Sequence, residues 1–336
     1  MSNAPLRLAI IGCGAITEIG YMPALQNMPD FHVHALIDSD LIRAKELAGK
    51  YGVPCIYLNI SDVLKEVDAV VIATPPHIRP EIAEKALSHG LHVLCEKPLA
   101  NSKADCEKIV RAAEKSGCVL AVAHTFRFYP NRNYVYELIK NNALGKINTV
   151  NIEEGSPADW PTKTGYTFRK EMVPGGVLLN NGIHSLDTLF WWFGEPLEFV
   201  YKDDSIGGLE SNARIEMKYH SDIEVKFRLS RTCHLDNKII IICEKGQICL
   251  PIYDPVKIEM HIDGENNIKI LTPNDFGFVD AVVSQLRDFA ESIMHIRLPR
   301  VTGIDGLKVI GFIERCYCIK RSRPIPERVP IPGIMW

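Results

Sequence analysis

The sequence predicts an α/β protein, with an N-terminal doubly wound parallel sheet followed by a C-terminal α+β domain that has a mostly antiparallel, open-faced sheet. Three observations predict it. Apolar runs alternate with helical patterns up to residue 124, strand-like runs joined by short turns fill residues 211–272, and 336 residues are enough for two domains. We expect domains at residues 1–124 and 125–336, and the last segment is free to pack back on the first domain.

The first domain is predicted element by element. Unbroken apolar strands that alternate with helices are typical of a parallel sheet covered on both faces. Helical patterns occupy residues 41–52, 79–90 and 101–117, and each ends near a glycine, which favours helix termination. The predicted strands are "LRLAIIG", "FHVHALID", "DAVVIATP", "LHVLCEKP" and "CVLAVAH", and "VPCIYL" is also strand-like.

The second domain begins with a helix at residues 131–142 and a strand at 145–155. A loop rich in proline, threonine and aromatic residues leads to a helix around His184. Two hairpins are then predicted, at residues 239–253 with a turn at Glu244–Gln247 and at 256–273 with a turn near Asp263–Asn266. No crossover helix fits between these runs, so the sheet is expected to be mostly antiparallel.

Composition excludes several classes of function. The net charge is -3, so no basic footprint indicates nucleic acid or an anionic membrane. No apolar run is long enough to span a bilayer, and we expect no signal peptide. The ten cysteines form no CxxC pair, so a reducing cytoplasm is expected. No metal site is expected, because the spacing of Cys316, Cys318 and His295 does not suit structural zinc.

A glycine turn follows the first predicted strand in "AIIGCGAIT". Gly12 permits the tight turn, and Gly14 lets the backbone approach a pyrophosphate at the N-terminus of the next helix. The third position of this dinucleotide fingerprint is Thr17 instead of glycine or alanine, so the motif is incomplete. We assign the whole turn to cofactor binding: Gly12, Cys13, Gly14, Ala15 and Ile16.

Asp38 ends the second predicted strand, with Ser39 beside it. A carboxylate here accepts hydrogen bonds from an adenosine ribose and repels the extra phosphate of NADP. Arg43 partly offsets that repulsion, so NAD is the expected cofactor, ahead of NADP. The alternative is that Asp38 only caps the following helix.

A second candidate site is "CEKPLA", at the carboxyl end of a predicted parallel strand, where open α/β sheets bind ligands. Pro98 makes the backbone rigid beside Lys97. Near a bound nicotinamide, desolvation and positive charge would lower the pKa of Lys97 and let it exchange protons near neutrality. The alternative is a surface pair between Lys97 and Glu96.

Taken together, these motifs resemble the glucose–fructose oxidoreductase / inositol dehydrogenase / rhizopine catabolism (Gfo/Idh/MocA) family of NAD(P)-dependent sugar oxidoreductases, whose first domain is a Rossmann fold. The resemblance covers nearly the whole chain. It is carried by "IIGCGAI", "ATPPHIRPEIAEKAL", "HVLCEKPLA", "HTFRFYP", "LGKI", "GG…NNGIHSLD" and "RLPRVTGIDGLKVIGFIE".

The resemblance implies roles for particular residues. Lys97 and His184 would be catalytic, with Lys97 also touching the cofactor. Substrate binding would fall to Arg127, Asn180, Asn181 and His184, and further cofactor contacts to Thr74, Pro75, His77 and Glu96. The chain departs from the family at Asn180, where an aspartate usually partners the histidine, and at Arg79 and His124. A homodimer or homotetramer is also implied.

His184 has three possible roles: metal ligand, buried structural histidine, or catalytic group. No second ligand of suitable spacing stands beside it, which disfavours a metal. Asp187 lies one helical turn on and is expected to hydrogen-bond the ring. Asn180 cannot stabilise an imidazolium by charge, which places the acid/base role on Lys97. Trp191 and Trp192 are expected in the core, whereas Trp160, Tyr166 and Phe168 could shape a sugar pocket.

The sequence therefore indicates an NAD-dependent dehydrogenase acting on a secondary hydroxyl of a sugar, a sugar nucleotide (at C3, for example) or a cyclitol. Two alternatives stay open. One is a non-catalytic dinucleotide-binding sensor, which the departure at Asn180 keeps in view. The other is an NAD-dependent lyase or glycosidase with no net redox change.

Overall fold

The computed structural model describes residues 4–157, 165–206, 208–264, 269–271 and 275–320. These residues form two compact units, each with a sheet of its own. The first unit takes in the described residues of 4–125, 165–166 and 278–311, and the second unit takes in the others.

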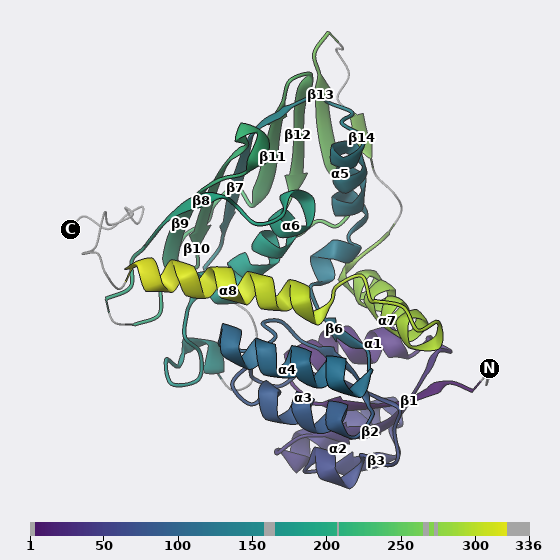
Figure 1. Cartoon of the computed structure of the whole chain (residues 1–336). Helices are drawn as coiled ribbons and strands as arrows, with labels where there is room; N and C mark the ends of the chain where they lie inside the picture. The colour runs from purple at the N-terminus through teal and green to yellow at the C-terminus, as the bar shows by residue number, and fades with distance from the viewer. Residues whose placement is uncertain (1–3, 158–164, 207, 265–268, 272–274, 321–336) are drawn as a thin grey trace. The chain divides into compact units, whose positions relative to one another are not determined.

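A six-stranded parallel sheet forms the centre of the first unit, in the order β3-β2-β1-β4-β5-β6 (Figure 1). Its strand order reverses beside β1, so the loops that follow β1 and β4 lie next to each other at the carboxyl edge, where such sheets bind ligands. The predicted parallel sheet is confirmed. The strands are β1 (Leu6–Ile11), β2 (Phe31–Ile37), β3 (Cys55–Tyr57), β4 (Ala69–Ile72), β5 (His92–Cys95) and β6 (Leu120–Val122).

Helices connect the strands of this sheet, and Figure 1 shows α3 and α4 side by side. Gly52 and Gly117, at the ends of α2 and α4, both have φ near +69°, a left-handed conformation that glycine adopts without strain. The predicted glycine stops are therefore confirmed for these two helices. The helices with residues in this unit are α1 (Met22–Leu25), α2 (Leu41–Tyr51), α3 (Arg79–Ser88), α4 (Lys103–Ser116), α7 (Phe278–Met294) and the first half of α8 (Gly303–Lys320).

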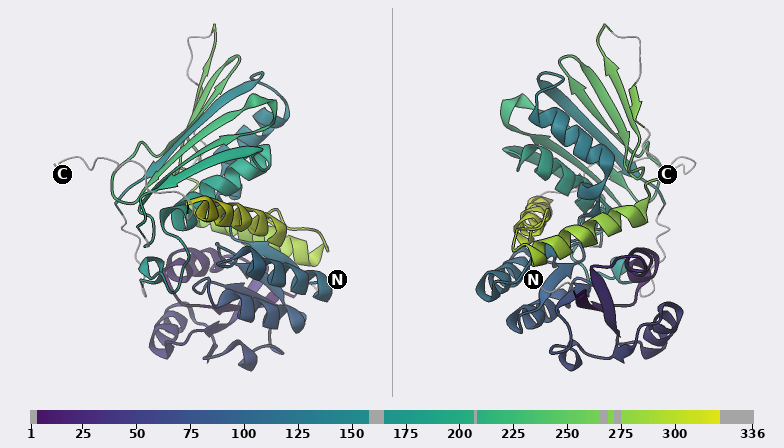
Figure 2. Two further views of the ribbon diagram at one scale, coloured as in Figure 1. Left: turned by 60° about the vertical axis from the view of Figure 1, so that its left-hand side comes forward. Right: turned by 90° about the vertical axis from the view of Figure 1, so that its right-hand side faces the viewer.

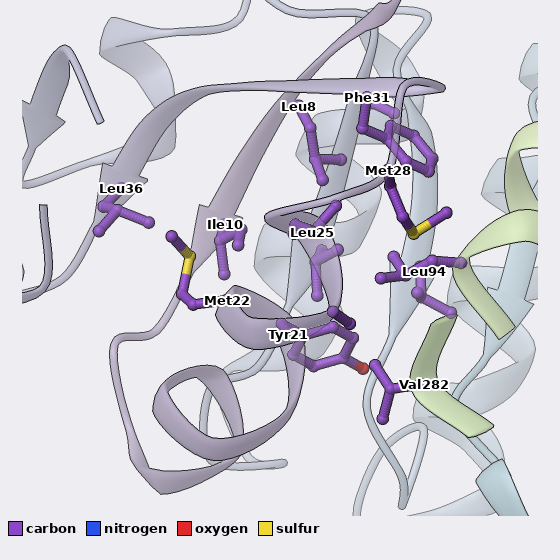
Figure 3. Close-up of a cluster of buried hydrophobic side chains, with 14 of the residues drawn as sticks. Leu8, Ile10, Tyr21, Met22, Leu25, Met28, Phe31, Leu36, Leu94 and Val282 are labelled. Carbon is purple, nitrogen blue, oxygen red and sulfur yellow. The ribbon is translucent and has the colours of Figure 1, made fainter. Parts of the chain in front are cut away.

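A buried apolar cluster joins β1 and β2 to α1 and α7 (Figure 3). Leu8 and Ile10 of β1 are fully buried, and Val282 of α7 is 2% exposed. Tyr21, 1% exposed, ends a π-helical turn (Thr17–Tyr21) that leads into α1. Burial of each large apolar side chain contributes about 1.5–3 kcal/mol, so this cluster fixes the helical segment that follows the glycine turn.

An eight-stranded sheet forms the second unit, in the order β14-β13-β12-β11-β7-β10-β9-β8. Neighbouring strands are antiparallel except β7 and β10, which are parallel. Both predicted hairpins are found, although the turn expected near Asp263–Asn266 extends outside the described residues. The strands are β7 (Ile147–Gly155), β8 (Glu198–Asp203), β9 (Asn212–Lys218), β10 (Glu224–Ser230), β11 (Lys238–Cys243), β12 (Gly246–Pro251), β13 (Ile258–Ile262) and β14 (Lys269–Leu271).

The two faces of this sheet differ. Figure 2 shows α5 (Pro130–Lys140) and α6 (Ile183–Phe193) lying on one face only. Along β10, side chains on that face are buried, as for Phe227, and alternate with exposed charged residues such as Arg228. The opposite face carries cross-strand charges, together with half-buried Ile240 and exposed Ile242 of β11.

The described part of the chain holds all ten cysteines, and each is a free thiol. Within the same described ranges, no helix is long and apolar enough to cross a membrane.

Candidate active site

The glycine turn after β1 is packed on one side and open on the other. Gly12 has φ +99°, and a Cβ there would lie 2.7 Å from the carbonyl oxygen of Ala73. A Cβ on Gly14 would meet no atom within 4 Å. Thr17 is fully buried, and its hydroxyl donates to the carbonyl of Gly12 at 2.5 Å. The threonine that breaks the fingerprint therefore holds the turn from within.

Asp38 joins the end of β2 to this turn. Its carboxylate accepts from the backbone N–H of Cys13 at 2.7 Å and from that of Asp40 at 2.8 Å. The helix α2 is capped by Asp40, whose carboxylate accepts from two backbone N–H groups of its first turn. The interpretation of Asp38 as a helix cap is therefore wrong. Arg43 lies against both acids, 3.8 Å from Asp38 and 3.1 Å from Asp40.

The residues around the turn fit a dinucleotide. The open side of Gly14 leaves room for a pyrophosphate. Asp38 lies at the end of β2, beside the position expected for an adenosine ribose. Thr74 follows β4 and is 8% exposed, yet its hydroxyl finds no partner among the described residues. Buried hydroxyls are normally hydrogen-bonded, so this one marks a place for a ligand atom. Of the remaining predicted cofactor residues, Ala15 is buried, Ile16 and Pro75 are half-buried, and Ser39 and His77 are exposed.

Lys97 lies just beyond β5 with its backbone held by Glu96. The Glu96 carboxylate is buried and accepts from the backbone N–H of Lys97 at 3.1 Å and from the hydroxyl of Tyr21 at 2.8 Å. Burial and the nearby Glu96 raise the pKa of Tyr21 well above its ordinary value. The Glu96 carboxylate therefore binds the backbone N–H of Lys97. The side chain of Lys97 is half-buried.

Arg79, at the start of α3, binds the same loop. Its guanidinium is 2% exposed and donates to the carbonyls of Thr74 at 2.8 Å and Glu96 at 2.6 Å, and to that of Pro98. In the sequence, Arg79 was notable only as a departure from the family. Its one visible signal was a cation at the N-terminus of a helix, where the helix dipole disfavours positive charge.

The aromatic residues before Gly175 have different positions. Tyr166 is half-buried in the first unit, and burial raises the pKa of its hydroxyl, with Arg79 and Glu96 acting on it in opposite directions. Phe168 belongs to the second unit, is 54% exposed and lies under the guanidinium of Arg231. Trp160 lies outside the described residues.

The helix that carries His184 begins with a π-helical turn, Leu178–Gly182, which continues into α6. Such turns occur often at functional sites. Glu210 holds this start, because its buried carboxylate accepts from the N–H groups of Gly176 at 2.7 Å and Leu178 at 3.0 Å. Tyr317 donates to the same carboxylate at 2.8 Å.

The two glycines before the helix leave room for these partners. A Cβ on Gly175 would lie 1.9 Å from the hydroxyl of Tyr317, and a Cβ on Gly176 would lie 2.0 Å from the carbonyl of Glu210. Burial raises the pKa of Glu210, and its three hydrogen bonds act against that shift. The sequence carried no sign of this contact, since Glu210 lies 34 residues from Gly176.

His184 stacks on Phe126, with ring centroids 4.6 Å apart and planes 23° apart. The histidine is half-buried, as are Asn180 and Asn181, and the Asn180 amide donates to the side-chain oxygen of Asn181 at 3.3 Å. Three polar side chains from one and a half helical turns are thus gathered on the π-helical turn and the start of α6.

Arg127 and Asp187 form a buried ion pair beneath this cluster. Two parallel hydrogen bonds of 2.8 Å join the guanidinium to the carboxylate, and the two side chains are 5% and 0% exposed. The hydrogen bond expected between the His184 ring and the accepting carboxylate of Asp187 stays a prediction, as does substrate binding by Arg127. Trp192 is buried as expected, whereas Trp191 is half-buried and stacks on Tyr136 with ring centroids 4.6 Å apart.

A second buried acid binds Ser185, the residue that follows His184. Glu154 of β7 is 1% exposed and accepts from the hydroxyls of Ser185 at 2.8 Å and Tyr253 at 3.0 Å. Buried Arg132 lies over Phe126 at 5.5 Å, and desolvation lowers the pKa of its guanidinium to about 10. Neither Glu154 nor Arg132 was predicted from the sequence.

The structure therefore gathers the predicted residues in two groups. The first unit holds the glycine turn, Asp38, Thr74 and Lys97, and the second holds Arg127, Asn180, Asn181 and His184. Each group is held by buried charged side chains that bond to backbone or to each other.

Comparisons with known proteins agree with this arrangement. Residues 6–124 match the model of the GFO/IDH/MocA oxidoreductase family with an NAD-binding Rossmann fold, and residues 133–249 match the GFO/IDH/MocA C-terminal domain. The chain is 24% identical to myo-inositol 2-dehydrogenase of Thermotoga maritima, over 90% of this chain and 92% of that protein. It is 28% identical to dTDP-3,4-didehydro-2,6-dideoxy-alpha-D-glucose 3-reductase of Actinomadura kijaniata, over 92% and 94%.

Among solved structures, aldose-aldose oxidoreductase from Caulobacter crescentus, complexed with glycerol, is similar with a TM-score of 0.85 and 25% identity, covering 95% of this chain and 98% of that one. The predicted fold, nicotinamide cofactor and enzyme class are confirmed at the level of the family. The chain belongs to the GFO/IDH/MocA family of oxidoreductases, with an NAD-binding Rossmann domain at its N-terminus.

Proposed function

We propose that the protein is an NAD-dependent dehydrogenase that oxidises a secondary hydroxyl of a sugar, sugar nucleotide or cyclitol, or reduces the matching ketone. The observation that carries the proposal is the clamped position of Lys97. Its backbone is held by Glu96 and its neighbours by Arg79, at the carboxyl edge of a sheet whose glycine turn fits a dinucleotide.

In this proposal Lys97, as a neutral amine, accepts the proton of the substrate hydroxyl. A nicotinamide held at this edge would supply the hydride acceptor for the carbon that bears the hydroxyl, and that carbon would become the ketone. Asp38 would accept hydrogen bonds from the adenosine ribose, and the turn from Gly12 to Ile16 would hold the pyrophosphate. His184 orients the hydroxyl or shares its proton, while Asn180, Asn181 and Arg127 bind the rest of the substrate.

The relatives support the substrate class without choosing a member. One is named for inositol and another for position 3 of a nucleotide sugar. Oxidation at C3 of a sugar nucleotide is a specific form of the proposal. The half-buried polar side chains of Asn180, Asn181 and His184 suit a ligand that carries several hydroxyl groups.

We also propose a homodimer or homotetramer, located in the cytoplasm. Ile240 and Ile242 of β11 lie on the sheet face that α5 and α6 do not cover, within a surface that is otherwise largely charged. A second subunit would shield these side chains. The ten free thiols suit a reducing compartment.

Two alternative functions are separable by experiment. A dinucleotide-binding sensor would bind NAD(H) without turnover, and Asn180 in place of an acid favours it. A lyase or glycosidase that oxidises and re-reduces its substrate would consume substrate without forming reduced cofactor. The held position of Lys97 argues against the sensor, because a sensor needs no amine placed at the nucleotide edge.

The test is a panel of sugars, cyclitols and sugar nucleotides incubated with the protein and NAD, read by the absorbance of reduced cofactor. Chromatography of each mixture detects consumption without cofactor reduction. We expect at least one compound to reduce NAD, and Lys97→Met to abolish most of that signal. Cofactor binding with no turnover on the whole panel would favour the sensor.

A further inference from the structure

Arg79 occupies a position that is electrostatically unfavourable for a cation. It is the first residue of α3, at the positive end of the helix dipole, and it is 2% exposed. Removing a guanidinium from water is costly unless hydrogen bonds replace its hydration. A cation kept at such a place must therefore make bonds that the fold or the site needs.

The bonds of Arg79 go to main-chain carbonyls of two loops. Nε donates to Thr74, at the end of β4, at 2.8 Å. Nη1 donates to Glu96 at 2.6 Å and also to Pro98. Glu96 and Pro98 are the residues on either side of Lys97, so one rigid guanidinium joins both neighbours of the lysine to the loop that holds the orphaned Thr74 hydroxyl.

Arg79 and Glu96 together form a clamp around Lys97, in which Arg79 binds carbonyl groups and the Glu96 carboxylate binds an N–H group. The Glu96 carboxylate accepts from the N–H of Lys97, and Tyr21 donates to it from the helical segment that begins at the glycine turn. Around Lys97, carbonyls are held by a cation and the N–H is held by an anion. The loop lacks the repeating hydrogen bonds of a helix or strand, so these side chains supply its backbone contacts.

We propose that Arg79 is the positioning residue for Lys97. It sets the place of the Lys97 backbone and ties that place to the Thr74 loop, on the cofactor side of the sheet edge. The inference deepens the proposed function and rests on it, since positioning matters only if Lys97 takes part in the reaction. A lysine cannot replace Arg79, because three carbonyls in different directions require the fork of a guanidinium.

The first experiment is chemical rescue of Arg79→Ala, assayed on the substrate identified for the wild type. Misplacement of a reacting group by about 1 Å lowers turnover by about 100-fold, so a loss of that size is expected at saturating NAD, with the KM for substrate nearly unchanged. Millimolar guanidinium chloride should restore much of the turnover, whereas equal concentrations of urea or sodium chloride should not. Arg79→Lys should remain impaired.

Matched controls define the outcomes. Arg7→Ala removes an exposed arginine of β1 and should leave turnover unchanged, with or without guanidinium. Turnover of Arg79→Ala within a few-fold of wild type, or an equal rescue by urea, would overturn the inference. A loss of NAD affinity with normal turnover at saturating NAD would also overturn it, because that result indicates a role in cofactor binding alone.

A second measurement does not depend on activity. Amide hydrogen exchange should become faster in Arg79→Ala for the peptide containing Glu96, Lys97 and the residues up to Ala100, and for the peptide containing Thr74. The β1–β2 core should keep its protection. If these peptides exchange faster while Lys97→Met is fully active, the proposed role of Lys97 fails and the clamp stands. If exchange is unchanged, the clamp itself fails.

Discussion

The Lys97 loop in the first unit and the His184 helix in the second are held in opposite ways. A buried cation, Arg79, donates hydrogen bonds to backbone carbonyls around Lys97. A buried acid, Glu210, accepts hydrogen bonds from backbone N–H groups at the start of the segment that carries His184. In both regions a charged side chain from elsewhere in the sequence fixes the backbone near the reactive residue. A cation binds carbonyl groups in one region, and an acid binds N–H groups in the other.

The difference between the two regions lies in what the backbone can do alone. The helix after Gly182 makes its own repeating hydrogen bonds, so Glu210 serves only its beginning. The loop around Lys97 has no such repeat, so Arg79 and Glu96 together determine where the lysine lies. Disruption in the first unit should therefore change chemistry first, whereas disruption in the second should change folding first.

The largest expected effect is on Lys97 itself. Lys97→Met should lower turnover by about 100- to 10,000-fold, the usual contribution of a general base, while calorimetry shows NAD binding largely intact. Lys103→Met, at an exposed position on α4, is the matched control and should keep wild-type turnover. Turnover of Lys97→Met within tenfold of wild type would remove Lys97 from the reaction.

The second effect is on stability. Asp187→Asn keeps the shape of the side chain but leaves the Arg127 guanidinium buried without its counter-charge, which should cost about 3–5 kcal/mol. Urea unfolding measures this free energy. Asp222→Asn, in an exposed pair with Lys146, should change stability by less than about 1 kcal/mol. Equal effects of the two substitutions would contradict the assignment of Arg127 and Asp187 as a buried pair.

The third effect depends on pH. Burial raises the pKa of Glu210, so the folded state binds a proton there more tightly than the unfolded state does. Unfolding then releases a proton, and stability from this residue decreases as pH rises above the ordinary pKa range of a glutamate. Glu210→Gln should unfold more easily by about 1–3 kcal/mol at low pH, because the NH2 group of glutamine cannot accept the backbone hydrogen bond that a carboxyl oxygen accepts.

The difference between Glu210→Gln and wild type should become smaller as pH rises. Thermal unfolding across a pH series follows this trend, with Glu216→Gln on the exposed face of β9 as the control. A difference that grows with rising pH would mean that the pKa of Glu210 is lowered in the folded protein.

The smallest effect concerns the cofactor. Asp38 should make NAD(H) bind about tenfold more tightly than NADP(H), which requires only about 1.4 kcal/mol. Arg43 is already engaged by Asp38 and Asp40, which weakens it as a phosphate ligand. Asp38→Ala should narrow the preference in titrations of both cofactors, and tighter binding of NADP(H) by the wild type would contradict the role given to Asp38.

Local patterns predicted most of the fold. The apolar runs located β1, β2, β4, β5 and β6, glycines marked the ends of α2 and α4, and both hairpins followed from apolar runs separated by turn residues. The fingerprint turn and Asp38 were also predictable, because a strand, a glycine turn and an acid at the next strand end lie within one short segment.

The residues that position the site through long-range contacts could not be predicted in this way. Glu210 reaches Gly176 across 34 residues, and Tyr317 reaches Glu210 across 107 residues. The burial of charge is also hidden from the sequence. Arg79 was visible only as a cation at a helix start and Arg127 only through the family resemblance, and neither signal predicted a buried side chain. The Gly175–Gly176 pair was visible as a motif, but its reason, two large polar neighbours at less than a Cβ contact distance, required the structure.

The most direct test of the account compares turnover against pH for wild type, Lys97→Met and His184→Ala on the active substrate. Lys97 is assigned the proton, and His184 lacks an acid at position 180 to hold it as a charged partner. We therefore predict a greater loss in Lys97→Met than in His184→Ala. The pH profile of His184→Ala should keep the low-pH limb of the wild type, where turnover falls because Lys97 becomes protonated. Abolished turnover in His184→Ala beside nearly normal turnover in Lys97→Met would show that the two roles are reversed.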